Sequence, residues 1–218
     1  MHAPGTAARL AALAGELQTR LEHLHGDVDP SWRSPLGLAG EPASWMVGEG
    51  NEPVRRRLAA GLLDRCCGPR PPLTALDDTA GQLALMDRRQ LLARLVALAL
   101  LGRPGVLRCC IHRPARTALQ ELLGPAFEVL RSRSGGMAVP ADVAAWAPLA
   151  WAWVGYREML TAHAWPHRGV RRLARLGLPA SRGDAPPASR VPRAMSPAAQ
   201  RLTELDQLFN SSQGRSTC

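Results

Sequence analysis

The histidines and the acidic pairs are the residues whose spacing could support metal chemistry. His163 and His167 are four residues apart, which suits two ligands on one helix face, but Pro166 lies between them and no acidic ligand follows. Asp77-Asp78 could chelate a cation, yet such a pair is more typical of a solvated turn or a helix cap. We therefore predict no metal site.

Catalytic patterns are missing as well. No nucleophile with a neighbouring base, no pair of carboxylates and no phosphate-binding loop can be recognised. Gly135-Gly136 follows no strand pattern, and the chain has no lysine to complete a phosphate-binding loop. We predict a protein that is not an enzyme, with no catalytic residues and no cofactor site.

Arginine is the most informative residue type in the chain. All 27 basic residues are arginine, and the 218 residues carry a formal charge of +9. Because residues with AT-rich codons are scarce, a GC-rich genome could explain this excess, and a selected anionic partner is the alternative. The charge is uneven: residues 168–193 hold seven arginines and one aspartate. Such a patch can attract an acidic partner without specifying which one.

Four of these arginines have helical spacing and form the candidate partner-binding site. Arg168, Arg171, Arg172 and Arg175 are separated by three, one and three residues. Such a run fits a solvated helix face or a docking face for an acidic partner, and both interpretations stay open. The tryptophans between 146 and 165 lie among Ala, Leu and Val, which predicts core packing rather than base stacking.

The elements that must position these residues are helices. Leucines at three- and four-residue steps predict a helix from Thr6 to Gly26, and residues 79–101 predict one long helix closed by Gly102. A further helical stretch begins after Pro140, with a break near Pro148. We predict a mainly α fold: a single compact helical domain with room for minor β elements, then a flexible linker and a C-terminal helix.

Composition divides the chain into four segments. Residues 1–28 form an N-terminal amphipathic helix, 29–180 the helical core, 181–195 a flexible linker, and 196–218 an amphipathic helix with its tail. The last helix can dock back on the core or onto another protein, and the sequence favours neither.

The apolar stretches indicate the compartment. The N-terminal Ala/Leu run is interrupted by Arg9 and Glu16, unlike a secretory signal. The longest apolar stretches, Leu95–Leu101 and Val143–Val154, are shorter than the ~20 residues of a membrane span. We expect a cytoplasmic protein without direct membrane insertion.

The central block resembles a known family. A leucine-rich helix from Leu91 to Gly102, the element Leu107–Ile111 and a helix from Leu119 to Gly124 are similar to those of the SctK family of type III secretion systems. Asp29-Pro30-Ser31-Trp32 is similar to the family's N-terminal segment, although its histidine is missing, and Arg172 to Pro179 resembles the end of the family's core.

This resemblance implies a function and its partners. SctK-like proteins are non-enzymatic adaptors of the cytoplasmic sorting platform, at the cytosolic face of the bacterial inner membrane. The implied partners are the cytosolic domain of the SctD-like inner-membrane ring protein and the SctQ-like pod protein, with the SctL-like stalk and the SctN-like ATPase as further ones. No nucleic acid is expected, and the alternative function is that of a basic helical nucleic-acid-binding protein.

Overall fold

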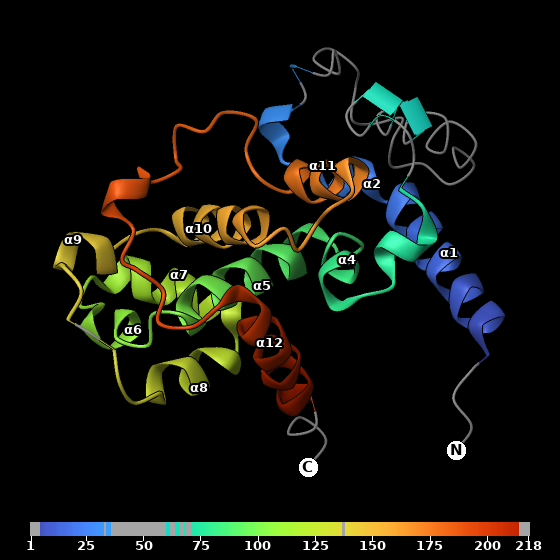
Figure 1. Ribbon diagram of the computed structural model, residues 1–218. Helices are drawn as coiled ribbons and strands as arrows, with labels where there is room; N and C mark the ends of the chain where they lie inside the picture. Colours follow the sequence, from blue (N-terminus) through green and yellow to red (C-terminus); the bar gives the residue numbers. More distant parts are fainter. Residues whose placement is uncertain are drawn as a thin grey trace. The chain divides into compact units, whose positions relative to one another are not determined.

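The described part of the chain is helical. A computed structural model describes residues 5–32, 34–35, 60–61, 64–65, 68, 71–136 and 138–213 (Figure 1). Within these ranges no residue belongs to a strand, and the predicted mainly α fold is confirmed. The sequence also predicts a short helix over 53–66, and most of these residues fall outside the described ranges.

The helices group into two compact units. Unit 1 comprises residues 1–88 and 165–181, and unit 2 comprises 89–164 and 182–218. Residues 165–181 thus group with the N-terminal segments, and the described residues 182–213 group with the middle of the chain. The elements of unit 1 are α1 (Thr6–Glu22), α2 (Leu24–Asp27), η1 (Pro30–Trp32), η3 (Leu73–Leu76), α4 (Thr79–Leu83) and α11 (Arg168–Leu176).

Unit 2 contains the longer series of helices. Its elements are α5 (Arg88–Leu101, whose first residue belongs to unit 1), α6 (Val106–Cys109), α7 (Arg113–Leu123), α8 (Ala126–Ser132), α9 (Ala141–Ala144), α10 (Pro148–Thr161), η4 (Ala188–Arg190) and α12 (Ala198–Gln213). Among the described residues, no helix is long and apolar enough to cross a bilayer.

Helix α1 follows the predicted leucine stripe but ends early. Leu13, Leu17 and Leu24 are buried, as the spacing predicts. The prediction that one helix continues to Gly26 is wrong, because α1 ends at Glu22 and α2 follows it. The backbone N–H of His23 turns back to the carbonyl of Thr19 and closes the helix.

The long helix predicted over 79–101 is two helices. α4 ends at Leu83, and α5 begins at Arg88 after a turn. The Asp78 side chain caps α4 by accepting a hydrogen bond from the Gly81 N–H at 2.6 Å. Gly81 lies so close to η3 that an added Cβ would be 2.4 Å from the carbonyl oxygen of Ala75. The glycine therefore lets α4 pack on η3, and the chain must turn before α5.

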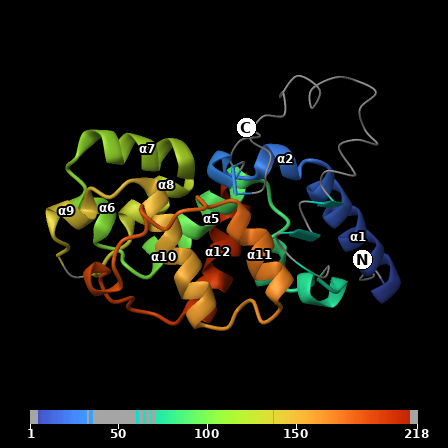
Figure 2. The same ribbon diagram turned by 90° about the horizontal axis from the view of Figure 1, so that it is seen from above.

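Helix α5 is the centre of unit 2. Every residue from Leu95 to Leu101 is buried, which is expected of a core helix that is apolar on all sides. Helix α10 crosses it closely, as Figure 2 shows, and a Cβ added to Gly155 would be 2.1 Å from the carbonyl oxygen of Leu95. The predicted break near Pro148 is confirmed, since this proline is the first residue of α10.

Helix α12 docks back on unit 2. Leu205 and Leu208 are buried, and α12 packs against α8. Glu204 pairs with Arg133 at 2.6 Å. Of the two alternatives that the sequence left open for the last helix, the structure thus supports docking on the chain's own core.

Gly155 provides a stability test with a matched control. Replacing Gly155 by alanine would place a methyl group on the Leu95 carbonyl, and we expect a loss of about 1–3 kcal/mol in the free energy of unfolding because the backbones must separate. Gly15 lies in α1 with nothing within 4 Å of an added Cβ, so Gly15→Ala should stabilise by about 0.5–1 kcal/mol. Urea unfolding measures both. Equal effects of the two substitutions would contradict the close crossing.

Candidate functional site

The four predicted arginines lie on α11 in unit 1. Helix α11 begins after His167, whose ring Nδ1 accepts a hydrogen bond from the Gly169 N–H at 3.1 Å. His167 therefore caps the helix in this structure. Val170 and Leu173 are buried on the opposite side from the arginine run. The apolar positions fix how α11 is turned and hence where its arginines lie.

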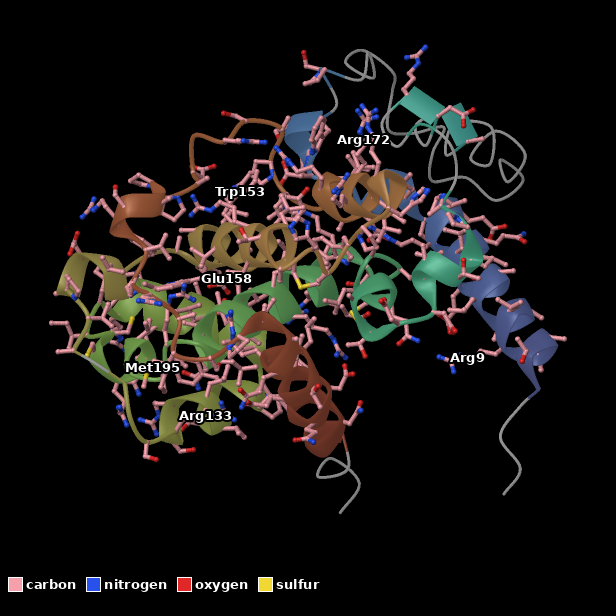
Figure 3. The ribbon with its side chains drawn as sticks, in the orientation of Figure 1. Arg9, Arg133, Trp153, Glu158, Arg172 and Met195 are labelled. Carbon is pink, nitrogen blue, oxygen red and sulfur yellow. The ribbon has the colours of Figure 1, made fainter. Side chains whose placement is uncertain are left out.

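The four arginines differ in their exposure and in their contacts. Arg168 is exposed, and Arg171 and Arg172 are half-buried, with Arg172 labelled in Figure 3. Arg175 uses its guanidinium within unit 1: it donates to the carbonyl oxygens of Leu178 at 3.0 Å and Ala180 at 2.9 Å. Of the four, Arg168 is therefore the most accessible to a partner.

The segment from Asp29 to Trp32 contacts the end of α11. The Asp29 N–H donates to the carbonyl of Leu176 at 2.8 Å, and the Trp32 indole N–H donates to that of Leu178 at 2.7 Å. The Arg175 guanidinium stacks on the Trp32 ring, 4.9 Å from its centre. These bonds satisfy carbonyls that the end of a helix leaves without partners. Residues 29–32 and the segment at the end of α11 are thus in contact, although Trp32 and Leu178 are 146 residues apart in the sequence. We call these contacts the Asp29 clamp.

Arg88 and Asp29 form the charged part of this clamp. The Arg88 guanidinium donates to Asp29 Oδ2 at 2.5 Å and to the carbonyl of Gly177 at 3.1 Å. Asp29 Oδ1 accepts from the Ser31 N–H at 3.0 Å and the Ser31 hydroxyl at 2.6 Å. Burial favours the neutral carboxyl, but the Ser31 hydrogen bonds and the Arg88 charge outweigh it, so the pKa of Asp29 lies below its ordinary value of 3.8.

A second charged cluster closes the end of α5 in unit 2. The Arg103 and Arg201 guanidiniums bind the two oxygens of one carboxylate, Glu158 on α10, at 2.6 and 2.5 Å. The two arginine side chains are only 5% and 3% exposed. They also donate to the carbonyls of Ala99 at 2.7 Å and Leu98 at 2.9 Å. Cations at a helix C-terminus are favourable because of the helix dipole.

This cluster positions the chain that follows residue 182. Arg103 Nε donates to the carbonyl of Pro192 at 2.6 Å, and Arg201 Nε donates to that of Ser196 at 3.1 Å. Within the segment predicted as a flexible linker, residues 181–195, the carbonyl of Pro192 is thereby bound to unit 2, and the Met195 N–H also donates to the carbonyl of Gly102 at 2.9 Å. Sequence reasoning missed this cluster. The available signals were Arg103, directly after Gly102 at the end of the helix, and Glu158, the one acidic residue in the largely apolar α10.

The tryptophans form core rather than a surface for stacking bases. Trp151, Trp153 and Trp165 are 0, 2 and 1% exposed. The Trp165 indole N–H donates to the carbonyl of Ala80 at 2.5 Å, and the Trp153 ring packs edge-on against Tyr156. The prediction of core packing is confirmed for these three rings, and a nucleic-acid base has no access to them.

The charged part of the clamp predicts a specific pH dependence. A carboxyl with a lowered pKa contributes stability that is complete above its ordinary value of 3.8 and is lost as pH falls through the lower folded value. Asp29→Asn should cost about 1–3 kcal/mol at pH 7 and should remove this part of the acid sensitivity. Unfolding curves between pH 7 and pH 2 measure it. Asp142→Asn, at a pair that is 55% exposed on both sides, is the control with little expected effect.

Glu158 gives a stability prediction for unit 2. Glu158→Gln would leave two buried guanidiniums without their anion, and we expect a loss of about 3–5 kcal/mol. Glu128 pairs with Arg131 on the surface, so Glu128→Gln should cost less than about 1 kcal/mol. Thermal and urea unfolding compare the two. A similar small loss in both variants would show that the cluster does not hold unit 2 together.

Comparison with known proteins places the chain in a family. Residues 4–210 match the family described as bacterial type III secretion protein (HrpB4). No curated protein and no solved structure gives a significant match. The match spans both units and includes the Asp29 clamp and the Glu158 cluster, and it agrees with the predicted kinship to a type III secretion accessory protein. The chain belongs to the HrpB4 family of bacterial type III secretion proteins.

Proposed function

We propose that this chain is a non-enzymatic adaptor of the cytoplasmic sorting platform of a type III secretion system. In this role it links the cytosolic domain of the inner-membrane ring protein to the pod protein and is needed for secretion. The observation that carries the proposal is the family match over residues 4–210. The adaptor works at the cytosolic face of the inner membrane.

The charges of the described residues support binding to acidic protein surfaces. Arg168 in unit 1 and Arg113 and Arg116 in unit 2 are all exposed. Exposed cations accelerate association with an acidic surface and make it sensitive to salt. Each unit thus offers its own basic surface, as an adaptor with two partners requires.

The fixed charge clusters also suit an adaptor. The Asp29 clamp holds the end of α11, so that its arginines keep one orientation. The Glu158 cluster attaches α12 and the preceding segment to α5 and α10. A surface that is already ordered loses less conformational entropy on binding.

A co-purification experiment tests the proposed function. The purified full chain is mixed with the cytosolic domain of the ring protein and with the pod protein of the same genome, and with duplex DNA as a control, at 50 and 500 mM salt. Retention of both secretion proteins but not of DNA is the expected result. Retention of DNA alone would overturn the proposal in favour of nucleic-acid binding.

A charge-reversal variant tests the basic face of α11. The double change Arg168→Glu and Arg172→Glu should weaken binding of one of the two partners by about tenfold at low salt, and by less at high salt, because exposed charges are screened. Arg131→Glu on α8 is the control for a general change in charge. Titration by fluorescence anisotropy gives the affinities. Equal losses in the double variant and the control would remove α11 as a binding face.

A further inference from the structure

Unit 2 contains a cleft that none of the charge clusters fills. Its volume is about 250 Å³. Two stretches form its walls, residues 138–140 before α9 and residues 189–195 from η4 onward, and the turn after α5 contributes Arg103 and Gly105. Figure 1 shows the chain leaving η4 and running toward α12, and Met195 on this path is labelled in Figure 3.

Residues 133–136, which lead into the first wall, are bound to α6 and to the turn before it. The Arg108 guanidinium donates to the carbonyls of Arg133, at 2.7 Å, and Gly135. Gly136 has a positive φ of 87°, and an added Cβ would lie 2.6 Å from the Gly105 nitrogen. Gly136 therefore packs directly against the turn that follows α5, in a backbone conformation that only glycine adopts easily.

The second wall is held by the same turn. Arg103 Nε binds the carbonyl of Pro192, and the Met195 N–H donates to the carbonyl of Gly102 at 2.9 Å. Both walls are thus held by contacts within unit 2. A cleft that exists before binding requires little ordering of the protein when a ligand enters.

The side chains along the cleft are largely apolar. Val139, Val191 and Pro192 are half-buried, and Met195 at the edge is 66% exposed. Met195 thus continues the apolar lining of Val139, Val191 and Pro192 to the surface, and contiguous apolar area of this kind is where binding surfaces are found. Methionine also adapts its shape to different partners.

The charges at the cleft are all positive. Arg103, Arg190 and Arg193 line it, and no acidic residue does. Arg103 shares the Glu158 carboxylate with Arg201, and Arg190 pairs with Asp142. Arg193 is exposed, and no described residue lies within ion-pair distance of it. The cleft thus combines apolar walls with an uncompensated positive charge.

We propose that this cleft binds a short segment of a partner protein in which a bulky apolar residue lies next to Asp or Glu. The apolar side chain enters the cleft, and the carboxylate pairs with Arg193. A nucleic acid fits less well because the lining contains no aromatic side chain on which a base could stack. The inference rests on the proposed adaptor function in one respect, since it locates one of the partner surfaces.

A peptide selection tests the cleft without knowledge of the partner. A random 12-residue library displayed on phage is selected against the full chain, and enriched peptides are synthesised with a fluorescein label. We expect enrichment of peptides that carry a bulky apolar residue beside acidic ones. Replacing the acidic residues by their amides, or the apolar residue by glycine, should each lower affinity about tenfold or more in fluorescence anisotropy.

Two cleft variants and two matched controls locate the binding. Ala138→Trp fills the cleft from an exposed position, and Arg193→Glu reverses its free charge; both should reduce peptide affinity at least about tenfold. Ala14→Trp on α1 and Arg131→Glu on α8 make the same changes at exposed positions outside the cleft and should leave affinity within about twofold. Thermal unfolding confirms that each variant is folded. Selection without an acidic–apolar consensus, or equal binding by cleft and control variants, would overturn the inference.

The same variants separate this inference from the proposed function. If the unaltered chain retains the ring and pod proteins, and if the selected peptides bind the cleft variants as well as the controls, the cleft inference fails and the adaptor function stands. If the unaltered chain retains neither secretion protein, the adaptor function fails, and the peptide selection still decides whether the cleft binds acidic–apolar segments.

Discussion

In unit 2, one carboxylate, that of Glu158, lies between two buried guanidiniums at the end of an apolar helix. Residues Leu95–Leu101 of α5 are all buried, so the carbonyls of its last turn need donors from the protein. Arg103 and Arg201 supply these donors, and Glu158 provides the negative charge that allows both cations to be buried. The same contacts attach α10 and α12 to α5. This ion cluster therefore holds α10, α12 and the end of α5 together, beside the Glu204–Arg133 pair and the buried leucines of α12.

Unit 1 uses a similar arrangement at the end of α11. The carbonyls from 176 to 178 accept hydrogen bonds from Asp29, Arg88 and Trp32. In both units, a helix end is satisfied by side chains or backbone from a distant part of the sequence. This arrangement bears on the high arginine content, for which codon bias and an acidic partner were the two explanations. Some of the arginines stabilise helix ends, and exposed ones such as Arg168 and Arg193 are available for partners.

Structural features that depend on local periodicity could be predicted from the sequence. Features that depend on contacts between distant residues could not. The leucine stripe of α1, the break at Pro148 and the buried tryptophans follow from spacing and residue type alone. The turn between α4 and α5 does not, because neither proline nor glycine marks residues 84–87. Its position is tied to Arg88, which binds Asp29, 59 residues earlier. Likewise, Glu158 binds Arg103 and Arg201, which are 55 and 43 residues away in the sequence, and no local pattern connects the three.

The location of the clamp also indicates where partner surfaces should be sought. The segments at 29–32 and 172–179 are two of those that make the chain resemble its family, and in the structure they contact each other. Trp32 and Arg175 are occupied by this contact, so these short motifs preserve the fold of unit 1. A family motif can thus mark an internal clamp and not a binding site. Exposed cations that form no ion pair with another described residue, such as Arg193 at an apolar cleft, are better candidates for recognition.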